Sequence, residues 1–165
     1  LYFDETANIT VPDIKAKVRR LKNVDCVFID YLGLLAPSKR SENKVQEIAD
    51  ITRNLKLMSK DLKIPVVCCT QLSRGPEAKS GRVSRKPILS DLRDSGAIEQ
   101  DADIVLLLYR EAYYKNEKEN PDEVRVDTAE LDVAKNRHGP TGTVNLTWDA
   151  EHTLFTVRDR FYDEN

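Results

Sequence analysis

The stretch Cys26-Val27-Phe28-Ile29-Asp30-Tyr31-Leu32 places an aspartate directly after four apolar residues. This pattern predicts a buried parallel strand with a carboxylate at its C-terminal end. In α/β proteins that hydrolyse nucleotides, an aspartate at this position holds Mg²⁺ beside the phosphates. The alternative interpretation is an ordinary strand-end aspartate that caps the next turn.

The usual partner of such an aspartate is a glycine-rich loop of the form G-x-x-x-x-G-K-[ST], placed one or more strands earlier. This motif does not occur in the 165 residues, and only a short segment precedes the strand. We therefore expect the later part of an ATP-driven motor domain, beginning after its phosphate-binding loop.

Length and composition predict one globular domain with a sizeable core, since the 165 residues are 40% hydrophobic and 33% charged. The net charge of -2 is unevenly distributed. Residues 71–93 carry six basic and two acidic side chains, whereas residues 94–132 carry twelve acidic and four basic ones. A basic segment inside an acidic protein predicts a contact with a polyanion. A solvated loop is an equally good interpretation of the same charges.

The three cysteines, Cys26, Cys68 and Cys69, lie in apolar runs without C-x-x-C spacing. This pattern favours buried free thiols in a reducing compartment. His138 and His152 are too few to complete a zinc site with them. No apolar run reaches the roughly 18 residues of a membrane span, and no signal peptide is visible. We expect a cytoplasmic protein that does not bind a membrane.

Helix signals occur at three places along the chain. Thr10-Val11-Pro12-Asp13 predicts a helix start, with threonine as N-cap and proline in the first turn, and the helix should run to about Lys22. Ser41-Glu42-Asn43-Lys44 opens a second helix, whose apolar residues recur at helical spacing as far as Leu62. A short third helix is expected over residues 88–100.

Apolar runs predict the strands 24–30, 66–70 and 103–109, and residues 1–4 resemble the end of another. Shorter runs separated by turn signals follow at 128–134, 143–147 and 154–158. They indicate an antiparallel meander. Alternating helices and strands followed by hairpins favour an α/β sheet with a parallel centre and an antiparallel edge. Ligands bind such sheets at the carboxyl ends of the parallel strands, where Asp30, Gln71 and Arg110 are expected.

Four motifs carry a resemblance to the RecA-like motor domain of the DnaB-type replicative helicases. They are Ile29-Asp30-Tyr31-Leu32, Thr70-Gln71-Leu72-Ser73-Arg74, the run from Leu89 to Asp103, and the run from Ala134 to Gly142. The last two, in this order and at this spacing, are the most specific. The resemblance implies a partial RecA-like P-loop NTPase fold with parallel central strands and an antiparallel C-terminal meander. Residues 1–165 are then the C-terminal portion of a single motor domain, without its Walker A region and N-terminal domain.

The same resemblance implies roles at the ATP site. Asp30 is the Walker B residue that holds Mg²⁺, and Gln71 senses the γ-phosphate. Lys135 and Arg137 are the pair that reaches the ATP of the neighbouring subunit. Two residues apart at a strand end, both side chains leave the same face. An ordinary basic β-turn is the alternative interpretation for this pair.

The segment Arg93-Asp94-Ser95-Gly96 resembles the family's loop that contacts single-stranded DNA in the central pore. The resemblance suggests that Arg93, Asp94 and Gly96 contribute, with backbone amides near the glycine gripping phosphates. A plain helix N-terminus is the other interpretation of this segment. The basic loop 72–87 is a second candidate for backbone contact, and its residues are Arg74, Arg82, Arg85 and Lys86.

The resemblance implies an ATP- and Mg²⁺-dependent DNA helicase that forms a homohexameric ring. The ring translocates on single-stranded DNA and unwinds the duplex at the replication fork, with primase and a helicase loader as partners. This chain alone is expected to be inactive. Two alternatives remain. One is a RecA-like module without a P-loop that binds DNA or a partner, and the other is a RecA- or KaiC-like ATPase.

Overall fold

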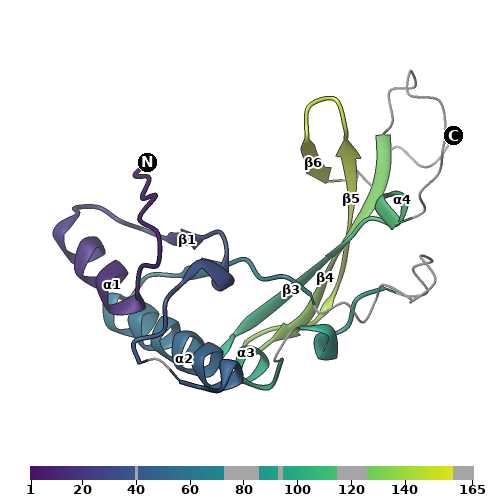
Figure 1. Cartoon of the computed structure of the whole chain (residues 1–165). Helices are drawn as coiled ribbons and strands as arrows, with labels where there is room; N and C mark the ends of the chain where they lie inside the picture. Colours follow the sequence, from purple (N-terminus) through teal and green to yellow (C-terminus); the bar gives the residue numbers. More distant parts are fainter. Residues whose placement is uncertain (40, 73–85, 93–94, 115–125, 158–165) are drawn as a thin grey trace, which may run out of the picture. The chain divides into compact units, whose positions relative to one another are not determined.

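The computed structural model describes residues 1–39, 41–72, 86–92, 95–114 and 126–157. Its chain divides into two compact units (Figure 1). The first unit comprises Leu1–Leu72 and Leu92–Ala102, and the second comprises Ser73–Asp91 and Asp103–Asn165. Each unit is described by itself below.

Two helices of the first unit begin where the sequence predicts. Helix α1 spans Val11–Arg20, and its N-cap Thr10 forms a capping box in which Asp13 N donates to Thr10 Oγ1 at 3.3 Å. Helix α2 spans Lys44–Leu62, and the Asn43 side chain accepts a 2.9 Å hydrogen bond from Val45 N. Lys63 ends α2 in the left-handed conformation with φ 58°.

The first unit also holds a two-stranded parallel sheet. Strand β1 (Val27–Ile29) pairs with β2 (Val66–Cys68) in the register Val27↔Val66 and Ile29↔Cys68. The core beneath it contains six buried residues, namely Val11, Ile29, Leu32, Ile51, Leu55 and Met58. Leu32 begins the short 3₁₀ helix η1, which spans Leu32–Leu34. The amphipathic helices and one face of the sheet therefore share a single core.

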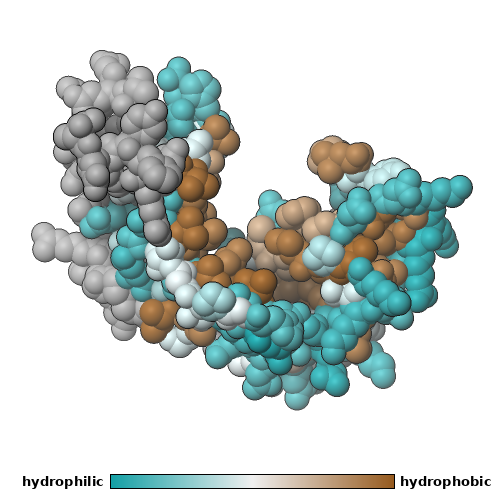
Figure 2. All heavy atoms as spheres, turned by 180° about the vertical axis from the view of Figure 1, so that it is seen from behind, coloured by the Kyte–Doolittle hydropathy of each residue, from teal (hydrophilic) through white to brown (hydrophobic). Residues whose placement is uncertain are grey.

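The opposite face of this sheet is apolar and exposed. Phe28 is 76% exposed and its register partner Val67 is 43% exposed. Apolar residues are also visible at the surface in Figure 2. Parallel sheets are usually covered on both faces. Within the described chain, however, this small sheet is covered on one face only.

The second unit is an antiparallel meander with the strand order β3-β4-β5-β6. Its strands are β3 (Ile104–Tyr109), β4 (Val126–Asn136), β5 (Gly142–Asp149) and β6 (Leu154–Val157). The 3₁₀ helix η2 (Leu89–Asp91) and the helix α4 (Glu111–Tyr114) belong to the same unit. Val105, Leu107 and Ala129 are its buried apolar residues.

The arrangement of the strand over residues 103–109 differs from the sequence prediction. It is antiparallel to β4 and lies in a different sheet from β1 and β2, so the expected single sheet is not formed by the described residues. The strand is buried on one face only, because Val105 is 7% exposed while Ile104 and Leu106 are 56% and 52% exposed. A short apolar run does not reveal which neighbour a strand will take, and pairing with β4 decides the outcome here.

Two further predictions are wrong. Residues 1–4 are exposed and form no strand, since no neighbouring strand in the described chain pairs with them. The helix expected over 88–100 is divided into η2 and the helix α3, which spans Ser95–Asp101. Between them Leu92 forms an isolated antiparallel bridge with Leu72, and this extended backbone interrupts the helix. None of the helices in the described ranges has the length and apolar character to cross a membrane.

Candidate nucleotide and nucleic-acid site

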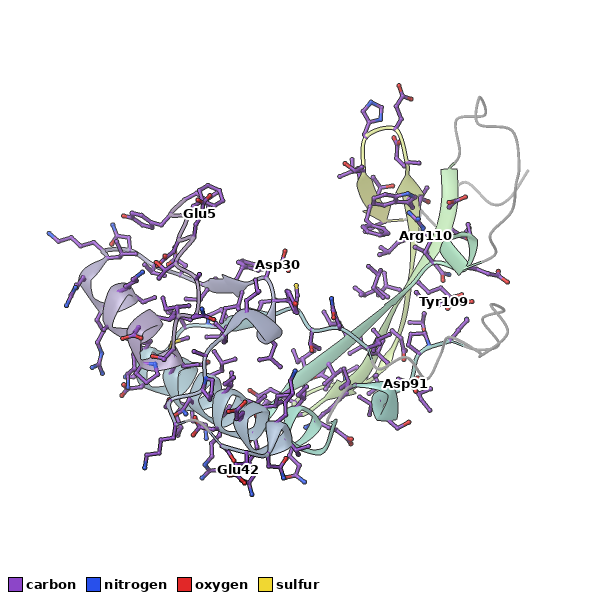
Figure 3. The ribbon with its side chains drawn as sticks, viewed as in Figure 1. Glu5, Asp30, Glu42, Asp91, Tyr109 and Arg110 are labelled. Carbon is purple, nitrogen blue, oxygen red and sulfur yellow. The ribbon has the colours of Figure 1, made fainter. Side chains whose placement is uncertain are left out.

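Asp30 and Gln71 follow the carboxyl ends of two adjacent parallel strands. Asp30 comes directly after β1, and Gln71 lies a short step beyond β2. Both residues are exposed, and Figure 3 labels Asp30 at the end of its strand. Because parallel strands end at the same edge, the structure brings these two predicted site residues to one edge of the first unit.

Backbone hydrogen bonds join the two strand ends beyond the ladder. Cys69 N donates to the carbonyl of Ile29 at 2.9 Å, and Leu32 N donates to the carbonyl of Cys69 at 2.9 Å. These bonds bracket Asp30 on both sides in the chain. The segment that carries its carboxylate is therefore anchored to β2 rather than left as a free loop.

The negative charge of Asp30 acts on a neighbouring thiol. Burial, with smaller contributions from the charges of Cys69 and Asp30, raises the pKa of Cys68 to about 12. Cys68 is thus a neutral thiol that donates to the carbonyl of Cys69 at 3.5 Å. Its neighbour Cys69 is exposed, so the prediction of buried thiols is wrong at that position.

One exposed carboxylate at a strand end fits Mg²⁺, which keeps most of its waters and takes one or two carboxylates from the protein. In the described part of the chain, no three His, Cys, Asp or Glu side chains gather as a metal cluster. Asp30 would therefore suit a magnesium ion, and the described residues around it do not form a protein cage for calcium or zinc.

Lys135 and Arg137 lie at the end of β4 in the second unit. Lys135 is half-buried within the strand and pairs with Val105, while Arg137 follows the last residue of the strand. The register shifts between Val105 and Leu106, which leaves Ala134 as an extra residue on β4. A β-bulge of this kind bends the strand and redirects the side chains beyond it.

Arg137 is attached to the start of β3 by two contacts. Its backbone N donates to the carbonyl of Asp103 at 2.8 Å, and its Nε lies 3.3 Å from Asp103 Oδ1. The pair is partly exposed, at 48% for Arg137 and 41% for Asp103. The sequence did not predict this partner for Arg137.

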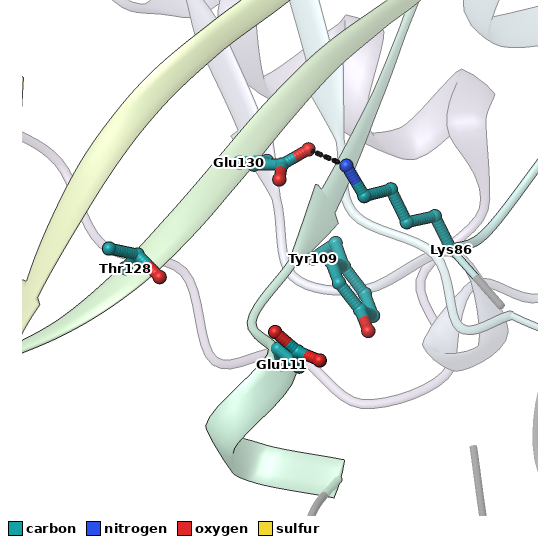
Figure 4. A pocket seen from close by; sticks show the side chains of 5 residues that line it. All are labelled: Lys86, Tyr109, Glu111, Thr128 and Glu130. Carbon is teal, nitrogen blue, oxygen red and sulfur yellow. Dashed lines mark hydrogen bonds and ion pairs between the residues drawn. The ribbon is translucent and has the colours of Figure 1, made fainter. Parts of the chain in front are cut away.

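Lys86 belongs to the described end of the basic loop 72–87, and it is bound to an acidic residue. Its ammonium group lies 2.5 Å from Glu130 Oε2, and this hydrogen bond raises the pKa of Lys86 (Figure 4). The two residues line a small cavity of about 120 Å³ together with Tyr109, Glu111 and Thr128. Two carboxylates against one ammonium make this cavity unfavourable for a phosphate.

Most of the predicted DNA-contacting residues lie outside the described part of the chain. They are Arg74, Arg82, Arg85, Arg93 and Asp94. Gly96 is described, lies exposed in the first turn of α3, and has open space where a Cβ would stand. No steric reason within the described chain therefore requires glycine at this position.

Arg110 follows the antiparallel strand β3, so its expected place at the end of a parallel strand is wrong (Figure 3). Its Cζ lies 4.8 Å from the centre of the Trp148 ring on β5, and Trp148 in turn contacts Phe155 with ring centres 4.5 Å apart. This cation–aromatic cluster was not predicted from the sequence. Its members come from three segments, and no local pattern pairs them.

Comparison with known proteins identifies relatives along almost the whole chain. The family model described as the DnaB-like helicase C terminal domain matches residues 1–157. The replicative DNA helicase DnaB of Leifsonia xyli subsp. xyli is 47% identical over 158 residues, and that of Geobacillus stearothermophilus is 44% identical over 168 residues. These alignments cover 94% and 99% of this chain but only 33% and 35% of the two relatives.

A solved structure, described as a DnaB-like replicative helicase and its interactions with primase, superimposes with a TM-score of 0.81. It is 40% identical, and the match covers 95% of this chain and 37% of that one. The predicted fold class, an α/β RecA-like fold with parallel central strands and an antiparallel C-terminal meander, is confirmed. The chain spans about a third of the length of these curated relatives, and it belongs to the DnaB-like helicase C-terminal domain family.

Proposed function

We propose that this chain is part of the ATP-driven motor of a replicative DNA helicase. The observation that carries the proposal is the family match over residues 1–157, in a fold that brings Asp30 and Gln71 to neighbouring strand ends. The relatives that share this segment are named replicative DNA helicases. The chain spans about a third of the length of these relatives, so the proposed activity is that of a full-length helicase that contains this segment.

Within the subunit's own ATP site, Asp30 binds Mg²⁺ directly or through water. The ion supplies neutralisation of charge on the phosphates. Gln71 contacts the γ-phosphate or the attacking water, since a neutral amide both donates and accepts a hydrogen bond without taking a proton. Backbone bonds on both sides of Asp30 support this role, because they hold the backbone that carries the carboxylate in place before ATP arrives.

Lys135 and Arg137 act on the ATP of the adjacent subunit. Arginine matches phosphate geometry with its planar fork, and lysine adds a point charge. Together they stabilise the charge that develops on the transferred phosphoryl group. An ATP site shared in this way requires neighbouring subunits, so we propose a homohexameric ring in which every subunit completes the next site.

Single-stranded DNA is the proposed track. Arg74, Arg82, Arg85, Lys86, Arg93, Asp94 and Gly96 are the proposed contacts. The open space around Gly96 supports a close approach of the DNA backbone, because the described chain itself makes no use of the missing Cβ. For Lys86 the contact competes with Glu130, which already binds its ammonium group.

Primase and a helicase loader are the proposed protein partners, and the cytoplasm is the proposed location. One structural relative is described together with its interactions with primase, which supports the first of these partners. Successive hydrolysis around the ring would move the DNA-binding loops and draw one strand through the centre.

The proposed action of Arg137 on the ATP of the adjacent subunit, its trans role, is tested with Arg137→Ala in the longer protein. We expect loss of DNA-stimulated ATP hydrolysis, with intact hexamers in size-exclusion chromatography with light scattering. Arg53→Ala is the matched control, because it removes an arginine from the exposed face of α2. Undiminished hydrolysis by Arg137→Ala would remove the trans assignment.

The DNA role is tested with Arg93→Ala. We expect weaker binding of a fluorescent oligo-dT. When log Kd is plotted against the logarithm of the salt concentration, the slope should fall by about 1. Arg53→Ala again serves as the control for a lost surface charge. An unchanged affinity and slope for Arg93→Ala would contradict the assignment of this segment to DNA.

A further inference from the structure

Asp103 and Arg137 stand at the shared end of strands β3 and β4. The ladder ends with the pair Ile104↔Asn136, and the next residues outward are Asp103 on one strand and Arg137 on the other. Arg137 N donates to the carbonyl of Asp103 at 2.8 Å, so the backbone of Arg137 is fixed to the ladder. The side chains add a second attachment, with Arg137 Nε 3.3 Å from Asp103 Oδ1.

The bulge on β4 lies immediately before this pair. Ala134 has no partner on β3, while Val133 pairs with Leu106 and Lys135 pairs with Val105. Lys135 and Arg137 therefore both follow the bulge, and their direction depends on how the chain is held beyond it. Asp103 supplies both the backbone acceptor and the side-chain partner at that point.

The ion pair contributes little to folding, because both side chains are largely in contact with water. Arg137 is 48% exposed and Asp103 is 41% exposed, and ion pairs of this kind are weak in high dielectric. The same exposure leaves the guanidinium accessible to another molecule. A guanidinium carries five N–H donors, so a contact through Nε does not exhaust its capacity to bind phosphate oxygens.

We infer that Asp103 is a positioning residue for Arg137, holding its guanidinium in the direction needed to contact the phosphates of the neighbouring subunit's ATP. The inference rests on the trans role proposed for Arg137. A long side chain that is ordered in advance loses less conformational entropy when it engages the transition state. Asp103 does not touch the nucleotide and acts only through the arginine.

The experiment compares Asp103→Asn and Asp103→Glu in the longer, hexameric protein. Steady-state ATP hydrolysis with saturating oligo-dT yields kcat and KM, and thermal unfolding of the same samples yields Tm. We expect Asp103→Asn to lower kcat by up to about 100-fold, which is what a misplacement of about 1 Å can cost. KM for ATP and Tm should stay near the wild-type values, and Asp103→Glu should recover part of the loss in kcat because it keeps a carboxylate.

Asp132→Asn is the matched control. It also removes a carboxylate from β4, but the Asp132 carboxylate accepts its hydrogen bond from Thr143 Oγ1, at 3.2 Å. This variant should keep its kcat. A fall in kcat equal to that of Asp103→Asn would show a general effect of lost charge and would overturn the inference.

The double variant Asp103→Asn/Arg137→Ala separates this inference from the proposal on which it rests. If Asp103 acts only through Arg137, the double variant is no slower than Arg137→Ala alone. A further loss in the double variant, or an unchanged or raised kcat in Asp103→Asn, overturns the positioning role while leaving the arginine's role intact. Full activity of Arg137→Ala would overturn the trans role itself.

Discussion

The Thr52 hydroxyl of α2 donates a 2.8 Å hydrogen bond to the Asp101 carboxylate at the end of α3. Thr52 is only 7% exposed, so its hydroxyl makes this polar contact from a buried position on α2. It joins two helices of the first unit that are far apart in the sequence. The predicted DNA-contacting segment runs into the first turn of α3, so the contact ties the last residue of that helix to α2.

Replacing Thr52 with valine should destabilise the first unit. The change keeps the shape of the side chain but leaves the Asp101 carboxylate without this donor, which costs about 1–3 kcal/mol. We expect a lower midpoint in urea unfolding, and Thr52→Ser should restore most of the loss because it retains the hydroxyl.

Thr143→Val provides the comparison for that prediction. Thr143 also donates to an aspartate, Asp132, at 3.2 Å, but it is exposed. Its loss should change the free energy of unfolding by less than about 0.5 kcal/mol. Equal effects of the two valine variants would mean that burial of the Thr52 contact has no energetic consequence.

Cys69 should react with iodoacetamide before Cys68. Cys69 is exposed, whereas burial raises the pKa of Cys68 to about 12. At pH 8 only about one Cys68 thiol in 10⁴ is then ionised, and the thiolate is the reactive form. Peptide mass spectrometry after short alkylation should find Cys69 modified and Cys68 intact. Comparable labelling of the two residues would refute this ordering.

The raised pKa of Cys68 also predicts a loss of stability in alkaline solution. Well below pH 9 the Cys68 thiol is protonated in both folded and unfolded chains, so it causes no pH dependence there. From pH 9 toward the raised pKa of about 12, the unfolded chain releases the proton and the folded chain keeps it. The free energy of unfolding should then fall by at most about 1.4 kcal/mol per pH unit. Urea unfolding at several pH values should show a shallower slope for Cys68→Ala.

Glu130→Gln should strengthen binding of single-stranded DNA by the longer protein if Lys86 contacts the DNA backbone. Glu130 binds the Lys86 ammonium and raises the pKa of Lys86, so the neutral amide removes a competing negative charge when phosphate approaches. Fluorescence anisotropy across a salt series should show a slope steeper by up to about 1. Asp127→Asn, which removes a carboxylate from the same strand, is the control for a nonspecific change in charge.

Arg110→Met should alter the environment of Trp148, the single tryptophan of the chain. The variant removes a cation that lies 4.8 Å from the centre of the ring. We expect a shifted emission maximum and a loss of about 0.5–1 kcal/mol in unfolding followed by that fluorescence. Arg110→Lys keeps a cation, so its emission maximum and its free energy of unfolding should lie between those of the wild type and Arg110→Met. An unchanged spectrum in Arg110→Met would show that the contact is absent in solution.

Local chemistry made much of the fold predictable. The caps Thr10 and Asn43 mark the starts of α1 and α2, because capping depends on residues a few positions apart. The six β-strands of the described chain also lie where apolar runs predicted them. The candidate site was predictable to the same extent, since Asp30 and Gln71 follow two such strands.

Pairing between distant segments was not predictable in the same way. The run Ile104–Tyr109 is apolar throughout, and this pattern suits a parallel strand as well as an antiparallel one. Only its ladder with β4 decides that it joins the meander, and only the register of that ladder reveals the bulge at Ala134. These features depend on hydrogen bonds between residues remote in the sequence.

The sequence by itself determined the family, the approximate elements and the residues that we propose for the ATP chemistry, because motif spacing and periodicity are local properties of the chain. Tertiary structure decided the partners of those residues. Arg137 meets Asp103, Lys86 meets Glu130, and Thr52 meets Asp101. Such contacts form only when folding brings separate elements together, and no pattern along a single segment records which charges will then be neighbours.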